Sequence, residues 1–480
     1  MTETLFAASV PPRLPPALAE RVNATDTGPV FVGVDVSVMK LLLLVTFHGH
    51  VSDVAIEMID APPLTPTFTV AAEITYHDTV HRHVCDTRAI IRPLAITLGS
   101  ERLLNSLALN GARVGVVCNP ASVDRELRHI ADRLLTHSGT TLTAIFGPQH
   151  GFRSDVQENM IETGHALDDI RRVPVYSLYS ETREPTAAML CDVDVLVIDL
   201  QDVGTRIYTY IYTMANCLIA ARKHGRKVIV CDRPNPIGGV AVEGPMLVKG
   251  LESFVGMYPV PMRHGMTIGE LARLFNDEFG IGADLDVVAM EGWRREMHFD
   301  ATGVPWVLPS PNIPTLDSAM VYPGAVLFEG TNVSEGRGTT RPFELIGAPW
   351  VAGEHFADAL NRLDLPGVRF RPIVFEPTFH KHTKTQCGGC QIHVLDRTTF
   401  RPVETGVALL EAFRAAGRDR FAWRQPPYEY EPSKPPIDIL AGTSELREQI
   451  EAGISAREIA GGWETGVGVF DEVRRRFLLY

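Results

Sequence analysis

Six carboxylates stand in or beside loops in the middle of the chain: Glu158, Glu162, Glu181, Asp199, Asp202 and Asp232. Hydrolysis of a glycosidic bond usually needs one carboxylic acid that protonates the leaving oxygen, and commonly a second carboxylate, in surroundings that separate their pKa values. These residue types therefore favour glycoside hydrolysis. Each carboxylate also has a structural alternative, because an Asp that ends a parallel strand often caps the next helix or orders a turn.

Arginines, histidines and tyrosines accompany these carboxylates. An Arg can hold a substrate carboxylate with a bidentate fork, although ion pairs within the protein are its default role. His150 and His264 each precede a glycine, whose backbone freedom lets the imidazole face a ligand. Tyr208 stands near the start of a long apolar run and could reach the same place. Arg337 is the best arginine candidate because two glycines flank it; the four candidates are Arg153, Arg206, Arg233 and Arg337.

The elements that must position these side chains become readable from Gly111 onwards. Short β-branched runs alternate there with helical stretches, which is typical of βαβ units and a mainly parallel sheet. We expect one helix capped by Ser122, another over about 207–223, and capping boxes at 267–270 and 455–458. We expect strands at 113–118, 142–146, 173–178, 194–200 and 227–232.

Ligands of open parallel sheets bind outside the carboxyl ends of the strands. Four successive loops at that edge carry polar, Gly and Pro residues, so we expect them to build a single site. These loops are 147–151, 179–183, 199–204 and 232–239.

Two groups of residues superficially resemble metal sites. Cys387 and Cys390 have zinc or redox spacing, but no second pair completes a four-ligand site, so we expect a turn with two incidental thiols. The histidines and cysteine at 77–85 lie on an alternating stretch, where such spacing arises by chance. We therefore expect neither a metal nor a cofactor.

Composition bounds the remaining possibilities. The chain has 480 residues, 45% hydrophobic and 21% charged, which suits two or three globular domains. A net charge of −13 provides no general basic field, so we expect neither nucleic acid nor a membrane as a partner. Seven scattered cysteines and a start without a signal-peptide pattern favour the cytoplasm, with secretion as the open alternative.

A series of motifs in a fixed order resembles the exo-β-N-acetylmuramidase family and covers about 97–480. Its members are Asn119-Pro, Phe146-Gly-Pro-Gln-His-Gly-Phe-Arg153, Asp199-Leu-Gln-Asp-Val-Gly204, Arg206-Ile-Tyr-Thr-Tyr210, Asp232-Arg-Pro-Asn-Pro236, Arg263-His-Gly-Met-Thr267, Ser310-Pro-Asn-Ile-Pro314, Glu329-Gly-Thr-Asn332, Gly336-Arg-Gly-Thr339 and Phe477-Leu-Leu-Tyr480.

The resemblance implies an α/β fold, with a Rossmann-like parallel-sheet catalytic domain over 97–310 and a smaller auxiliary α/β domain over 311–480. Residues 1–96 are left as an N-terminal extension of unknown function. The implied activity removes N-acetylmuramic acid from the non-reducing ends of peptidoglycan fragments, as in cell wall recycling. The lactyl carboxylate of that sugar would suit one of the arginines. Asn235, Asn312 and Asn332 then join the substrate-binding candidates, together with Gln149, Tyr208, Asp232, His264 and the arginines.

The most important departure from the family lies in the loop at 147–151. The usual Pro-Glu-His-Gly, whose Glu is the proposed catalytic acid, reads Pro148-Gln149-His150-Gly151 here, and an amide cannot donate a proton as a carboxylic acid does. Three alternatives stay open: Glu158 or Glu162 on the same loop takes over the role, the substrate is a different amino-sugar glycoside, or the chain is a non-catalytic cell-wall-sugar binding protein.

The other catalytic candidates are His150 and the aspartates Asp199 and Asp202, with Asp232 as a further base or sugar ligand. A nucleotide-linked Rossmann enzyme is a weaker interpretation, because it would need a glycine-rich turn after Cys118, where the chain has Asn-Pro-Ala-Ser.

Overall fold

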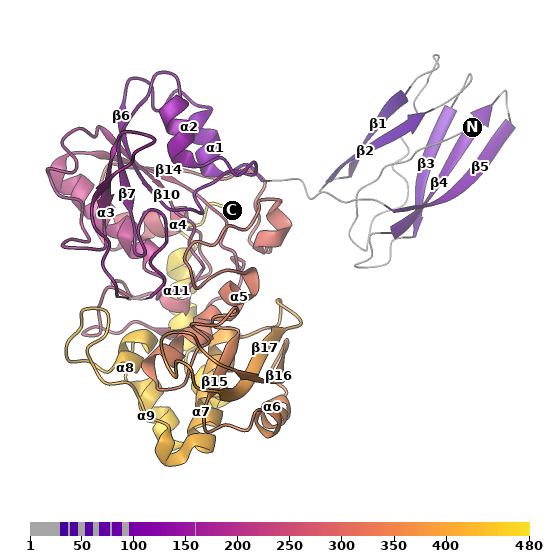
Figure 1. Cartoon of the computed structure of the whole chain (residues 1–480). Helices are drawn as coiled ribbons and strands as arrows, with labels where there is room; N and C mark the ends of the chain where they lie inside the picture. Colours follow the sequence, from indigo (N-terminus) through magenta and orange to yellow (C-terminus); the bar gives the residue numbers. More distant parts are fainter. Residues whose placement is uncertain are drawn as a thin grey trace. The chain divides into compact units, whose positions relative to one another are not determined.

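The computed structural model describes residues 96–158 and 160–480 and, before residue 96, the backbone of five strands (Figure 1). The chain divides into two compact units, Met1–Leu94 and Ala95–Tyr480. In the first unit, β1 (Pro29–Val36) pairs antiparallel with β2 (Met39–Thr46). A second antiparallel sheet contains β3 (Asp53–Asp60), β4 (Thr67–Tyr76) and β5 (Thr79–Arg88). The side chains of the group at 77–85 lie outside the described residues.

A seven-stranded sheet organises the first half of the second unit. Its strand order is β14-β11-β10-β6-β7-β9-β8, and every pair is parallel except β8 with β9. The strands are β6 (Arg113–Cys118), β7 (Thr141–Gly147), β8 (Ala166–Leu167), β9 (Pro174–Ser177), β10 (Val195–Asp199), β11 (Lys227–Cys231) and β14 (Leu285–Val288). The expected Rossmann-like α/β fold class and its five strands are confirmed. The Val- and Ile-rich runs form these strands because both faces of the sheet are covered.

Helices cover this sheet, and two of them lie where helices were expected over about 207–223 and after the capping box at 267–270. They are α1 (Gly99–Leu104), α2 (Ile130–Thr136), α3 (Tyr210–His224), α4 (Ile268–Arg273), the π-helix η1 (Leu274–Glu278) and the 3₁₀ helix η2 (Phe299–Thr302), beside a small pair β12 (Glu243–Met246) and β13 (Pro261–Arg263). Thr267 and Glu270 form the predicted capping box of α4. The prediction of a helix capped by Ser122 is wrong, because the Asp124 carboxylate accepts bonds from the backbone of Glu126 and Arg128 and orders a turn. The helix begins only at Ile130, capped by the His129 side chain.

A smaller three-stranded antiparallel sheet, in the order β15-β17-β16, organises the second half. The elements are α5 (Leu316–Ala325), η3 (Val326–Gly330), β15 (Leu345–Ala348), α6 (Gly353–Asn361), β16 (Val368–Phe375), β17 (Cys387–Val394), α7 (Pro402–Gly417), η4 (Arg418–Arg420), α8 (Pro436–Ala441), α9 (Glu445–Ala452), α10 (Ala456–Gly461) and α11 (Glu464–Arg474). The Ser455–Glu458 capping box is present at α10.

The Cys387–Cys390 segment corrects another expectation, because it begins strand β17 rather than forming a turn. Gly388 and Gly389 separate the two buried thiols. A Cβ on either glycine would collide with a backbone carbonyl oxygen, that of Val351 or Ile346. The glycines therefore allow close strand packing.

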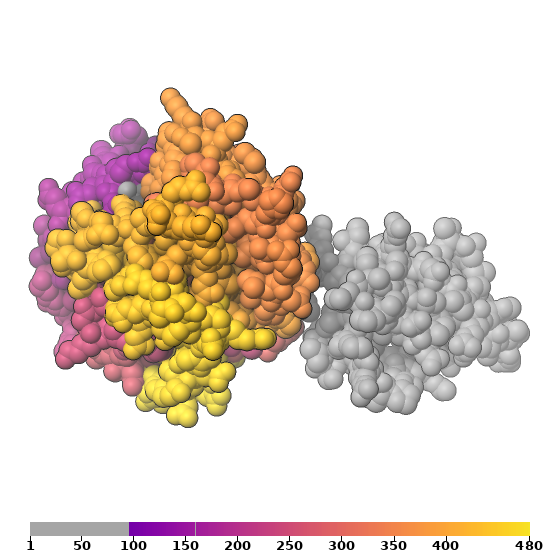
Figure 2. All heavy atoms as spheres, turned by 90° about the horizontal axis from the view of Figure 1, so that it is seen from below, coloured from indigo at the N-terminus to yellow at the C-terminus, as the bar shows by residue number. Residues whose placement is uncertain are grey.

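The two halves share one hydrophobic core. A single cluster of buried side chains runs from Val117 on β6 to Phe477 near the chain end. Helix α11 contacts β12 and β13, and the Tyr480 hydroxyl donates to Asp232 Oδ2 at 2.7 Å. In Figure 2, residues coloured orange to yellow cover most of the coloured surface, with the violet and magenta sheet domain at their margin. The end of the chain therefore packs back onto the first half.

No helix among the described residues is both long and apolar enough to cross a bilayer.

Candidate functional site

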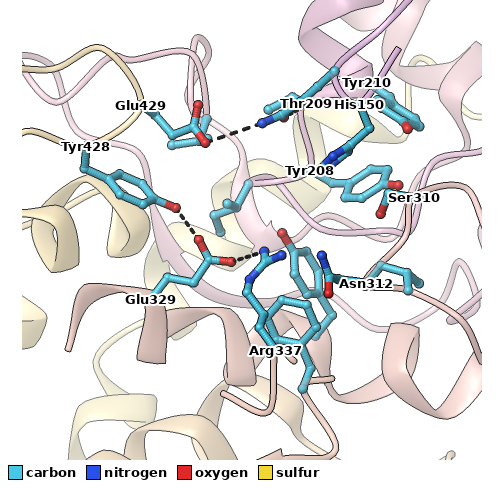
Figure 3. A pocket seen from close by; sticks show the side chains of 16 residues that line it. His150, Tyr208, Thr209, Tyr210, Ser310, Asn312, Glu329, Arg337, Tyr428 and Glu429 are labelled. Carbon is cyan, nitrogen blue, oxygen red and sulfur yellow. Dashed lines mark hydrogen bonds and ion pairs between the residues drawn. The ribbon is translucent and has the colours of Figure 1, made fainter. Parts of the chain in front are cut away.

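A buried polar cavity is lined by residues of both halves of the second unit (Figure 3). The sheet half contributes the loop after β7 and the turn before α3. The other half contributes η3, the glycine-rich loop after it, and the Pro-rich segment before α8. The cavity encloses about 40 Å³, which is room for two or three water molecules.

His150 lies in the loop after β7 with a left-handed backbone (φ 70°). Its Nδ1 donates to the Val156 carbonyl oxygen at 2.7 Å, so Nε2 is the acceptor of the ring. Burial lowers the pKa of His150 to about 4. The imidazole is thus neutral near pH 7 and suits accepting a hydrogen bond.

Gln149 is held in one orientation. The Thr209 hydroxyl donates to its Oε1 at 2.8 Å, which directs the amide nitrogen Nε2 to Glu429 Oε1 at 3.5 Å. The amide therefore presents a donor to a carboxyl group that comes from the other half of the chain.

Glu429 is buried, with 3% of its surface exposed. Besides the Gln149 amide, the Tyr179 hydroxyl contacts it, donating to Oε2 at 3.0 Å. Burial raises the pKa of Glu429 to about 7, and the nearby Glu329 adds to the shift. Its backbone φ is 45°, a sparsely populated region for a side chain of this kind. Glu429 is thus a strained, buried carboxyl group that can carry a proton near neutral pH.

Arg337 lines the same cavity from the glycine-rich loop after η3. Its Nη2 donates to Glu329 Oε1 at 2.6 Å, and the Tyr428 hydroxyl donates to the other oxygen of Glu329 at 2.6 Å. Its Nε lies 3.4 Å from Glu335 Oε1. Among the described residues, Arg337 Nη1 has no hydrogen-bond partner. Nη1 is therefore a buried, positively charged donor that can bind an acceptor group of a ligand.

An open groove of about 270 Å³ also borders Glu429. Tyr430, Phe254 and Arg183 line it, and the Arg183 guanidinium lies 3.8 Å from the centre of the Tyr430 ring. Glu429 lines both the groove and the inner cavity. Glu429 therefore borders both a polar cavity and an open groove with aromatic walls.

Five of the predicted site residues come together in the inner cavity. They are Gln149, His150, Tyr208, Asn312 and Arg337. The Asn312 amide also donates to the Gln157 carbonyl oxygen at 2.8 Å, which fixes it against the His150 loop.

Two pairs of predicted residues lie outside both cavities and contact each other instead. Asp199 and Arg233 form a buried ion pair at 2.6 Å. His264 Nε2 lies 3.3 Å from Asp202 Oδ2. The ion pair matches the default role of an arginine such as Arg233.

Four more predicted residues make structural hydrogen bonds. Asp232 accepts from Thr267 Oγ1, the Gly269 amide and Tyr480. Arg206 donates to three backbone carbonyl oxygens, Asn235 to that of Met266, and Asn332 to that of Arg420. None of the four lines the inner cavity.

The loop carboxylates Glu158 and Glu162 are exposed and do not line the inner cavity. Glu162 and Arg153 line a separate cavity of about 480 Å³ beside β8 and β9. Glu162 accepts from the Tyr430 hydroxyl at 3.1 Å. The acid role of either glutamate stays a prediction.

Sequence reasoning missed Glu429, Tyr428, Tyr179 and Glu329. Tyr179 opens one of the four loops expected to build the site, and Glu329 opens a motif that was singled out for its other members, so the sequence did carry a signal for these two residues. The Pro-rich segment around Glu429 resembles no catalytic motif, and only the fold brings it to Gln149. Among the described residues, no group of three or more His, Cys, Asp or Glu side chains is arranged to hold a metal ion.

Comparisons with known proteins agree with this architecture. Residues 114–317 match the family described as exo-β-N-acetylmuramidase NamZ, N-terminal, and residues 320–480 match its C-terminal counterpart. The peptidoglycan β-N-acetylmuramidase NamZ of Bacillus subtilis (strain 168) is 48% identical over 372 residues, covering 78% of this chain and 88% of that protein.

Two solved structures of DUF1343 family proteins from Bacteroides fragilis NCTC 9343 share the fold. One has a TM-score of 0.71 and 36% identity, covering 81% of this chain and all of that one. The other has a TM-score of 0.61 and 29% identity, covering 80% of this chain and 99% of that one.

Proposed function

The chain belongs to the exo-β-N-acetylmuramidase NamZ family, and from this premise we propose that it is a glycoside hydrolase that releases N-acetylmuramic acid from the non-reducing ends of peptidoglycan fragments. The 48% identity to the Bacillus subtilis enzyme carries this proposal. The inner cavity supports it, because it combines a cationic donor, a neutral imidazole and a protonatable carboxyl group.

Arg337 is the residue that we propose binds the lactyl carboxylate of the sugar. Its Nη1 has no hydrogen-bond partner among the described residues, while Glu329 and Glu335 hold the rest of the guanidinium in place. A fixed guanidinium suits a carboxylate better than a flexible ammonium does. His150 Nε2, Tyr208 and Asn312 are then proposed to contact sugar hydroxyl or acetamido groups.

We also propose that the enzyme works on wall fragments inside the cell. The six cysteines among the described residues are all free thiols, which suits a reducing compartment. Measuring the activity in separated cytoplasmic and extracellular fractions would decide this, and activity confined to the medium would contradict it.

The test of the function is to incubate the protein with a disaccharide that carries N-acetylmuramic acid at its non-reducing end and to measure the free sugar. We expect release from this substrate and little from the matching disaccharide that ends in N-acetylglucosamine. Tight binding without release would instead favour a cell-wall-sugar binding protein.

A further inference from the structure

We propose that Glu429, contributed by the second half of the chain, is the general acid that protonates the glycosidic oxygen in this protein. The inference rests on the proposed function and names the residue that performs its central step. It assigns the role to a carboxyl group about 280 residues from the loop that carries Gln149.

The first support is location. Glu429 lines both the inner cavity and the open groove. A substrate with its muramic-acid ring in the cavity and its leaving group in the groove would therefore bring the glycosidic oxygen beside this residue. The groove suits a leaving sugar, because Tyr430 and Phe254 offer aromatic faces. Glu158 and Glu162 line neither of these two spaces.

The second support is the set of contacts around the carboxyl group. A neutral amide, that of Gln149, and a neutral hydroxyl, that of Tyr179, orient its two oxygens without supplying a counter-charge. Both hydrogen bonds and the charge of Arg337 favour the ionised carboxylate, but burial and the nearby Glu329 outweigh them and favour the acid. The surroundings of Glu429 thus keep a proton available near neutral pH, consistent with its raised pKa.

The chemical step follows from this placement. The Glu429 carboxyl group gives its proton to the glycosidic oxygen as the bond between that oxygen and the anomeric carbon breaks, and the leaving sugar departs as an alcohol. A water oxygen becomes bonded to the anomeric carbon and loses a proton to the solvent, and the Glu429 carboxylate takes up a proton from the solvent, which restores the acid. One water is consumed for each bond broken.

The test compares Glu429→Gln with wild type on two substrates, a muramic-acid-terminated disaccharide and a nitrophenyl glycoside of N-acetylmuramic acid. A nitrophenolate leaves without protonation, whereas a sugar hydroxyl does not. We therefore expect kcat/KM to fall roughly 10²- to 10⁴-fold on the disaccharide and far less on the nitrophenyl glycoside. Glu243→Gln is the matched control, because this buried glutamate also has a pKa raised to about 7 and lines neither space.

Tyr179→Phe keeps the inference testable if Glu429→Gln does not fold. Removing the hydroxyl that stabilises the ionised carboxylate should move the alkaline limb of the pH–rate profile upward. Equal losses on both substrates, or a larger loss in Glu158→Gln or Glu162→Gln, would overturn the assignment while leaving the function intact. A wild type that releases the sugar from neither substrate would overturn the proposed function and this inference with it.

Discussion

The side-chain amide of Gln149 lies 3.5 Å from the carboxyl group of Glu429. The first residue follows strand β7 of the parallel sheet, and the second precedes α8 in the other half of the chain. Both halves therefore build the site, and the second half contributes a polar side chain to it as well as hydrophobic packing.

Gln149→Glu should shift the pH dependence of catalysis. A second carboxylate beside Glu429 disfavours its ionisation, so its pKa rises and the acid persists to higher pH. The alkaline limb of kcat/KM should move up by about 1 pH unit or more. If the pH dependence of kcat/KM does not change, the ionisation of Glu429 does not determine its alkaline limb.

Arg337→Lys should weaken the preference for muramic acid. Lysine keeps the charge but loses the planar fork, so kcat/KM on muramic-acid glycosides should fall by about 10- to 100-fold, the equivalent of a charged hydrogen bond. The low activity on a nitrophenyl glycoside of N-acetylglucosamine, which lacks the carboxylate, provides the internal control and should change far less. Equal losses on both substrates would argue against a carboxylate contact.

Asp199→Ala should destabilise the fold. It leaves the Arg233 guanidinium buried without its ionic partner, which typically costs about 3–5 kcal/mol of unfolding free energy. Asp194→Ala, at the exposed pair with Arg113, should cost much less because water screens that pair. Urea unfolding of both variants measures the difference, and similar midpoints would contradict this structural role.

The contribution of Glu243 to stability should decline as pH rises from about 4.5 to 7. Burial raises the pKa of Glu243 from 4.5 to about 7, so the folded protein keeps a proton that the unfolded chain loses in this range. Each such group lowers the unfolding free energy by up to about 1.4 kcal/mol per pH unit. In Glu243→Gln the unfolding free energy should depend less steeply on pH, by the equivalent of one proton, when it is measured by urea titrations at several pH values. An unchanged dependence on pH would refute the raised pKa of Glu243.

The sequence pattern predicts the sheet well, because β-branched runs between helical stretches leave few alternatives to buried parallel strands. It predicts the boundaries less well where side chains compete with the backbone. The Asp124 carboxylate orders a turn where a helix was expected, and close backbone packing draws Cys387–Cys390 into a strand.

The site is only partly predictable, because the role of a side chain depends on contacts that distant segments make after folding. Gln149, His150 and Arg337 lie in recognisable motifs, and they do line the cavity. Asp199 and Asp232 lie in equally clear motifs but bind Arg233 and the start of α4 instead. Glu429 carries no motif of its own, and its role depends on contacts between distant segments.

The most direct measurement is free N-acetylmuramic acid released from one muramic-acid-terminated disaccharide by wild type, Glu429→Gln and Glu162→Gln at equal concentrations of folded protein. The account predicts rapid release by wild type, near-complete loss in Glu429→Gln and near-normal release by Glu162→Gln. Full activity in Glu429→Gln would contradict it.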